Sequence, residues 1–270
     1  RLNGPAVLVA DAAEPEEPQH PTGFQVLEEP VFEDITADSR LIIANEISNL
    51  INRVERVQQY NKDLQLEATQ VFDALRLNIY RLMAKGISGF DSPVAFNSVA
   101  EASATLESML EVFRYYNAPA SLIELCRDAI AYTSKNEDFN SFDRAVFITA
   151  YINPIMGQMH RFQVDRDIAF ATQQRAVNTK AVDIFQADAF NMYYFAPTGT
   201  TIASPAMLEL GRKLFNEPML SANGKRACVS CHEPKRAFTD GLTLNASLSG
   251  ERNLLRNTPT LINAALQPVQ

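Results

Sequence analysis

The pentapeptide Cys228-Val229-Ser230-Cys231-His232 constrains this chain more than any other part of its sequence. A C-x-x-C-H motif is the attachment signature of c-type haem. Its two thiols form thioether bonds to the porphyrin, and the neighbouring imidazole binds the iron from one side. On a helix, positions i, i+3 and i+4 share a face, so all three side chains would meet the same macrocycle. The motif therefore predicts covalently bound haem c, with Cys228 and Cys231 as anchors and His232 as the iron ligand.

Two other interpretations of the motif are weaker. A structural zinc site needs four ligands, and the second pair usually comes from another paired motif. The remaining candidates, Cys126, His20 and His160, are not paired at ligand spacing. A thioredoxin-type C-x-x-C lies among alternating strands and helices, and no such pattern surrounds residue 228.

The cysteine count and hydropathy indicate where such a chain works. The chain has three cysteines, two of them in the motif, so no disulfide framework is expected. No run of about 18 apolar residues occurs, so the sequence predicts no membrane span. Haem held by thioethers is normally assembled outside the cytoplasm. We therefore expect a periplasmic or otherwise exported protein, free or held to the cell envelope by a segment outside the printed sequence.

Charge is distributed unevenly along the chain. The formal net charge is −8, yet residues 211–256 contain eight basic and four acidic residues. A basic surround suits the two propionate carboxylates of a haem, because half-buried anions need paired cations. For any single residue, solvated surface charge explains the pattern equally well. The acidic remainder is too diffuse to indicate nucleic acid, so no nucleic-acid partner is expected.

The pattern of apolar residues predicts an all-α protein in three parts. Residues 1–33 are rich in proline and glutamate and predict an extended lead-in. Residues 34–190 have helical periodicity almost throughout, which predicts an antiparallel helical bundle. Residues 191–270 predict a cytochrome c-like haem domain, with short helices over 204–215 and 260–266.

Some features within the predicted bundle are specific enough to check. Pro154 should kink or break a helix near Asn153, and two shorter helices should follow over 164–177 and 180–190. Met156, Met159 and His160 are possible soft ligands for a metal, but methionines at helical spacing far more often fill a core. The role of this bundle is not indicated by its sequence.

Several short motifs surround the haem motif in a fixed order. They are LGRKLF at 210–215, LS at 220–221, ACVSCHEP at 227–234, KRAFTDG at 235–241 and RNTPTLINAA at 256–265. Together they resemble the first haem domain of bacterial dihaem cytochrome c peroxidases, a family that includes the MauG-type maturation enzymes. The resemblance covers about residues 205–266 and does not extend into the predicted bundle.

The resemblance implies a function and several partners. Such enzymes reduce hydrogen peroxide to water with electrons from a small cytochrome or cupredoxin, and a second haem relays those electrons. Carried over by position, Cys228 and Cys231 anchor the peroxide-facing haem and His232 is its proximal ligand. Asn257 matches an asparagine that helps to bind calcium between the two haem domains. The family also implies a homodimer.

The sequence departs from the family pattern in two places. Many relatives carry a histidine before the RNTP-like motif that blocks the distal side of this haem, and residues 245–252 contain none. An open, MauG-like haem is therefore expected. The chain also ends at Gln270 without any tryptophan, the distal acid–base groups or a second C-x-x-C-H. We expect this chain to be the first-haem part of a longer enzyme, incomplete by itself.

Two other functional classes stay open. The chain could be a single-haem electron-transfer cytochrome without peroxide chemistry. It could also be a binding module in which the helical part docks an envelope complex and the haem reports redox state.

Overall fold

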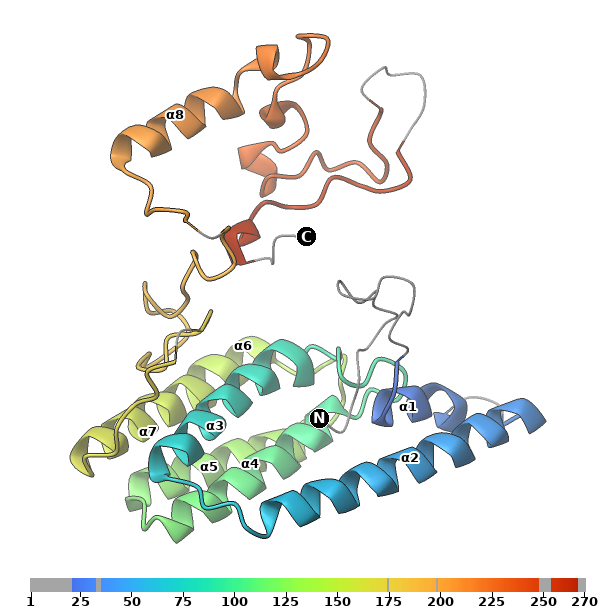
Figure 1. The fold of residues 1–270 in the computed structure, drawn as a ribbon, viewed down its shortest axis with the longest axis vertical. Coiled ribbons are helices and arrows are strands. Elements are labelled where there is room, and N and C mark those ends of the chain that lie inside the picture. The colour runs from blue at the N-terminus through green and yellow to red at the C-terminus, as the bar shows by residue number, and fades with distance from the viewer. Residues whose placement is uncertain (1–20, 33–34, 174, 198, 248–253, 267–270) are drawn as a thin grey trace. The chain divides into compact units, whose positions relative to one another are not determined.

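The computed structural model describes residues 21–32, 35–173, 175–197, 199–247 and 254–266 (Figure 1). By their contacts, the residues form two compact units, the first of Arg1–Thr172 with Thr179–Ala189, and the second of Gln173–Asn178 with Phe190–Gln270. Within the described residues the only β-type pairings are two isolated bridges, Val177 with Phe190 and Glu233 with Thr239. The predicted all-α class is confirmed.

The first unit is a helical domain (Figure 1). Its helices are α1 (Phe24–Phe32), α2 (Ala37–Asn61), α3 (Ala68–Arg81), α4 (Ser98–Tyr115), α5 (Ala120–Lys135), α6 (Arg144–Val146) and α7 (Asn153–Asp165). Helices α4 and α5 pack on each other, and α7 packs on both α5 and α3. Their apolar faces enclose a continuous core that includes Phe72, Phe113 and Phe147, all fully buried. Among the described residues, none of the helices combines the length and apolarity needed to cross a bilayer.

The first helix corrects the prediction of an extended lead-in for residues 24–32. Helix α1 contacts α2, and Phe24 and Leu27 line an apolar cavity together with Leu50 of α2. Glu28 also fixes α1, because its Oε1 accepts hydrogen bonds from Ser92 Oγ at 2.9 Å and from the backbone N of Ala95 at 2.9 Å. Tertiary contacts therefore outweigh the local effect of the proline and glutamate content. Residues 1–20 of the predicted lead-in lie outside the described part.

Two π-helical turns, at Leu82–Gly86 and Phe147–Ile152, continue α-helices. The second runs directly into α7 with helical backbone angles at Ile152 and Asn153, so the helix does not break at Asn153 as predicted. Pro154 lies in the first turn of α7, where its missing N–H costs little. The change along this segment is from a π-helical to an α-helical turn just ahead of the proline.

The prediction of two helices over 164–177 and 180–190 is wrong. Helix α7 ends at Asp165, and the described residues after it form turns and bends. Asp167 has a left-handed φ of 53°, and the N–H of Ile168 donates to Gln163 O at 2.8 Å. This is the hydrogen bond of a Schellman C-cap, which satisfies the last carbonyls and ends the helix.

A buried arginine holds the segment 179–189 on the helical unit. Arg76 of α3 is only 2% exposed, and its guanidinium donates to Ala181 O at 2.6 Å and to Gln163 Oε1 at 2.8 Å. Burial lowers the pKa of Arg76. Both acceptor oxygens belong to buried residues, so they depend on this guanidinium for their hydrogen bonds.

Replacing Arg76 with methionine should destabilise the helical unit by about 1–3 kcal/mol, because the apolar stem is kept while two buried acceptors lose their donor. Urea unfolding followed by circular dichroism measures the change. Arg161→Met is the matched control, since Arg161 is exposed on α7. Equal unfolding midpoints for the two variants would contradict the anchoring role.

The second unit has little regular structure. Its helix α8 (Pro205–Phe215) starts at Ser204, whose hydroxyl accepts from the N–H of Met207 at 3.3 Å, and this confirms the helix predicted over 204–215. Four 3₁₀ turns follow, at Pro218–Leu220, Cys228–Ser230, Pro234–Arg236 and Ala264–Leu266. The helix predicted over 260–266 is thus reduced to its last turn. No apolar side chain among the described residues of this unit is buried.

Candidate functional site

The haem motif lies on a single 3₁₀ turn, Cys228–Ser230, and not on the helix that its spacing predicts. The N–H groups of Cys231 and His232 both donate to Cys228 O, at 3.2 and 3.0 Å. Ser230 Oγ accepts from the N–H of Ala227 at 3.1 Å and closes the start of the turn. Pro234 follows immediately and lacks the N–H that a longer helix would need. One turn still presents Cys228, Cys231 and His232 together.

His232 is oriented by a hydrogen bond to the backbone. Its Nδ1 lies 3.0 Å from Phe238 O, an acceptor, so Nδ1 must carry the proton in this bond. In the neutral ring the lone pair is then on Nε2, the atom free to bind a metal. Metal-binding histidines commonly donate their other ring N–H to such a carbonyl. The tautomer and the ring orientation both suit an iron ligand.

A strained loop places that carbonyl. Ala237 and Phe238 both have left-handed φ angles, 53° and 58°. The loop is closed by the N–H of Phe238 to Glu233 O at 2.9 Å and the N–H of Glu233 to Thr239 O at 3.2 Å. Non-glycine residues hold such angles only where the surrounding structure enforces them, often at functional sites. Here the left-handed backbone of Ala237 and Phe238 directs Phe238 O toward the His232 ring.

A cavity of about 730 Å³ adjoins the motif. It is lined by Arg226, Cys231, His232, Asn245, Ala246, Leu254, Leu255, Arg256, Asn257, Thr258 and Pro259. Its volume lies within the range of about 300–1,000 Å³ that is typical of cofactor sites. The structure therefore brings together Cys231, His232 and Asn257 of the predicted residues, while Cys228 is exposed just before them.

A polar network that the sequence interpretation did not identify holds two walls of this cavity. Asn245 and Thr258 are buried. Asn245 Nδ2 donates to Thr258 Oγ1 at 2.7 Å, and both residues donate to Asp240 Oδ2, Thr258 at 2.9 Å. The N–H of Leu242 donates to Asp240 Oδ1 at 3.0 Å. Asp240 lies in the KRAFTDG motif and Thr258 in the RNTP motif. The fixed order of these motifs was therefore the only sequence signal that could have indicated this network.

These hydrogen bonds, led by the one from the Leu242 N–H, lower the pKa of Asp240. A lowered folded-state pKa stabilises the loop above the ordinary pKa of an aspartate and loses that effect as pH falls through the folded value. Asp240→Asn should therefore speed amide hydrogen exchange at Leu242 near neutral pH and make it less sensitive to acid. Hydrogen exchange of both proteins at neutral and acidic pH measures this. Unchanged exchange at neutral pH would contradict the bracing role of Asp240.

The residues of the cavity fit a haem. The donor set consists of two thiols and an imidazole whose Nε2 is left for the iron. Beside them, Leu254 and Leu255 expose apolar surface, and Leu255 is 96% exposed. An apolar macrocycle edge would cover that surface, which soluble domains seldom leave open in clusters. The donor atoms and the exposed apolar surface therefore both agree with the haem binding that the motif predicts.

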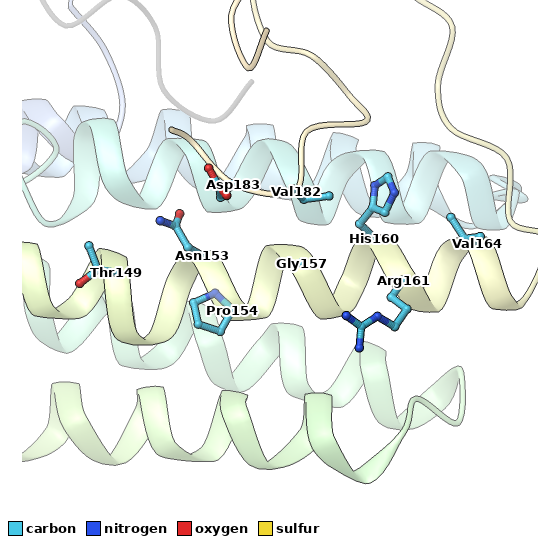
Figure 2. Close-up of a pocket in the computed structure, with 9 residues that line it drawn as sticks. All are labelled: Thr149, Asn153, Pro154, Gly157, His160, Arg161, Val164, Val182 and Asp183. Atoms are coloured by element: carbon cyan, nitrogen blue, oxygen red, sulfur yellow. The ribbon is translucent and has the colours of Figure 1, made fainter. Parts of the chain in front are cut away.

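The cluster of Met156, Met159 and His160 does not form a ligand set. Both methionines are fully buried in the core, whereas His160 lines a separate cavity of about 610 Å³ on the helical unit (Figure 2). In that cavity most lining residues come from the helix of Asn153 and His160, and Val182 and Asp183 come from the segment that crosses it (Figure 2). Cys126 is also buried in the core, and burial raises its pKa to about 12. The packing interpretation holds for the methionines and the cysteine.

A calcium role for Asn257 stays a prediction. The described residues contain no group of three or more histidine, cysteine, aspartate or glutamate side chains that could hold a metal ion. Asn257 itself lines the haem cavity.

The fold and the site define a class, that of all-α proteins with a C-x-x-C-H haem motif. The sequence model of the di-haem cytochrome c peroxidase family matches residues 205–270. Residues 205–270 are therefore similar to the di-haem cytochrome c peroxidase family, in the stretch where the motifs predicted a resemblance, and that similarity implies haem c.

Curated relatives match stretches of about the same length as the family model. MauG, a methylamine utilization protein of Paracoccus denitrificans, is 44% identical over 72 residues, 24% of this chain and 19% of that protein. Cytochrome-c peroxidase IdrP2 of a Pseudomonas species is 40% identical over 62 residues, 23% of this chain and 17% of that protein. Cytochrome c551 peroxidase of Nitrosomonas europaea is 34% identical over 64 residues, 24% of this chain and 19% of that protein. The matched segment thus spans about a fifth of each relative. No solved structure matches the chain.

Proposed function

We propose that this chain supplies the peroxide-facing haem of a dihaem enzyme that reduces hydrogen peroxide to water. One observation carries the proposal: every residue that lines the haem cavity, from Arg226 to Pro259, falls within the stretch 205–270 that matches the peroxidase family. The match therefore covers the complete described wall of the site and not only the pentapeptide.

Each residue of the site has a role in the proposal. Cys228 and Cys231 hold the haem through thioether bonds, which fix the macrocycle over the turn. His232 would supply the imidazole ligand to the iron, with its ring held by Phe238 O at 3.0 Å. The haem, when bound, supplies the redox chemistry with peroxide. The network around Asp240 keeps the cavity walls in place.

The proposal extends to partners outside the printed sequence. A second haem would relay electrons from a small cytochrome or a cupredoxin, since the family is dihaem and this sequence has one C-x-x-C-H. Calcium bound with the help of Asn257 would lie between the haem domains. Assembly with thioether-linked haem favours a periplasmic location, with or without an envelope anchor, and a homodimer is the expected assembly.

A MauG-like oxidative maturation enzyme is the second candidate. Two observations favour it: 44% identity to a MauG protein over 72 residues, and the lack of histidine over residues 245–252. Without a histidine in this segment, residues 245–252 would supply no imidazole to compete with peroxide for the iron before reductive activation. The substrate would then be a protein side chain in place of a reduced carrier.

The full-length gene product, loaded with haem during export, tests the proposal. We expect peroxide-dependent oxidation of a reduced small cytochrome or cupredoxin, and high-spin ferric signals in the electron paramagnetic resonance spectrum. The double variant Cys228→Ser, Cys231→Ser is the control without attached haem. Redox cycling without peroxide consumption would assign the chain to the electron carriers, and wholly bis-histidine low-spin haem would contradict the open distal side.

A further inference from the structure

Two arginines line the haem cavity without an acidic partner. Arg226 is half-buried and Arg256 is exposed, and both reach the cavity. No aspartate or glutamate is among the residues that line it. Within the described residues neither guanidinium forms an ion pair, although Arg226 Nη1 donates to Ala246 O at 3.0 Å. Among the described residues, the lining of the cavity therefore carries two positive charges and no negative one.

The other arginines of this unit for which ion pairs are described behave differently. Arg212 pairs with Glu209 at 3.2 Å, and Arg236 pairs with Glu233 at 2.9 Å. Both pairs are formed three residues apart along the chain and lie at the surface. The absence of a carboxylate partner thus distinguishes the two arginines that face the cavity.

The apolar and charged parts of the cavity lie together. Leu254 and Leu255 immediately precede Arg256, and Ala246 both lines the cavity and accepts from Arg226. A ligand that suits this lining is broad and apolar on one part and carries two negative charges on another. Guanidinium groups pair with carboxylates through charge-assisted and often bidentate hydrogen bonds.

We propose that Arg226 and Arg256 bind the two propionate carboxylates of the haem and set its orientation on the motif. The inference rests on the haem attachment in the proposed function, and it does not depend on peroxide reduction. Arg226 is the more fixed of the two, because its bond to Ala246 already restrains it. Arg256, which lines the same cavity, would pair with the second carboxylate.

The reduction potential of the bound haem tests this assignment in the full-length protein. Arg256→Gln leaves a propionate unpaired, and its negative charge then favours ferric over ferrous iron. We expect the equilibrium to shift about tenfold toward ferric near neutral pH, or about 59 mV for one electron. Arg256→Lys keeps the charge and should stay close to wild type.

The pH dependence adds a second readout. A neighbouring cation lowers the pKa of a carboxylate, so losing the cation raises it. The potential of Arg256→Gln should therefore rise toward the wild-type value as acid protonates the unpaired propionate, over a range where the wild type is flat. High salt should reduce the difference from wild type, because an exposed pair is screened.

Arg212→Gln is the matched control, because it removes an exposed arginine from the same unit but not from the cavity. If the potential and its pH dependence are the same in Arg256→Gln and Arg212→Gln, the assignment is overturned. If Arg256→Gln fails to accumulate haem while Arg256→Lys and Arg212→Gln load normally, the need for a cation at this position is supported. Equal loss of haem in the Gln and Lys variants at position 256 overturns a charge-based role. A wild-type protein without covalent haem would instead refute the proposed function.

Discussion

The His232→Gly variant should retain covalent haem but lose peroxide turnover by more than about a hundredfold. Cys228 and Cys231 are unchanged, so the thioether bonds still form, while the iron loses its proximal imidazole. Loss of groups that only orient a metal ligand typically costs about 10–100-fold, so loss of the ligand itself should cost more. Peroxide-dependent oxidation of a reduced cytochrome, measured per attached haem, gives the ratio.

Free imidazole makes this experiment more specific. Added to His232→Gly, it should restore part of the activity, because glycine leaves room for an imidazole held near the iron. His160→Gln is the control, since His160 lines a cavity on the helical unit and not the one at the haem motif. Full activity of His232→Gly without added imidazole would contradict the assigned ligand role.

Replacing Phe72 with alanine should destabilise the helical unit by about 3–5 kcal/mol, the usual cost of emptying a buried phenylalanine site. Phe72 is fully buried, and its ring contacts those of Phe113, Tyr116 and Phe162 at centroid distances of 6.4, 5.2 and 5.7 Å. Phe113 and Tyr116 belong to or adjoin α4 and Phe162 belongs to α7, so with Phe72 on α3 the cluster joins three helices and the cavity cannot close by moving one side chain. Urea unfolding monitored by far-ultraviolet circular dichroism measures the loss.

Phe185→Ala provides the comparison for Phe72→Ala. Phe185 belongs to the same unit but is 68% exposed, so its replacement should change stability little. Haem absorbance followed in the same titration reports the second unit separately. A loss below about 1 kcal/mol for Phe72→Ala would mean that the aromatic cluster is not the core of this unit.

The sequence predicted the fold best where one physical signal dominates. Helical periodicity located the long helices, and the short helix predicted over 204–215 is α8. The sequence prediction failed where tertiary contacts determine the local structure. Residues 24–32 form a helix because Glu28 is hydrogen-bonded to Ser92 and the helix has apolar contacts with α2. Residues 179–189 stay irregular, and the hydrogen bond from Arg76 to Ala181 O holds them in place. The local composition around residues 24–32 and 179–189 does not indicate that Ser92 or Arg76 would contact them.

The site was predictable in chemistry but not in geometry. The pentapeptide indicates the haem ligands, because two thiols and an imidazole at this spacing suit few other cofactors. It does not indicate that Phe238 O orients His232, because that bond depends on two left-handed residues that sequence patterns do not mark. The polar network of Asp240, Asn245 and Thr258 was likewise not predictable, because it joins residues up to 18 positions apart.

The two units differ in where their apolar side chains lie, and this bears on how the protein matures. The helical unit encloses its own core, so it has what it needs to fold as soon as its chain is complete. The haem unit buries no apolar side chain among its described residues, so in the proposed enzyme a bound haem would supply apolar contacts that this unit does not supply for itself. Haem attachment would then be the step that completes this unit, and proteolysis within residues 191–270 would distinguish molecules with haem from molecules without it.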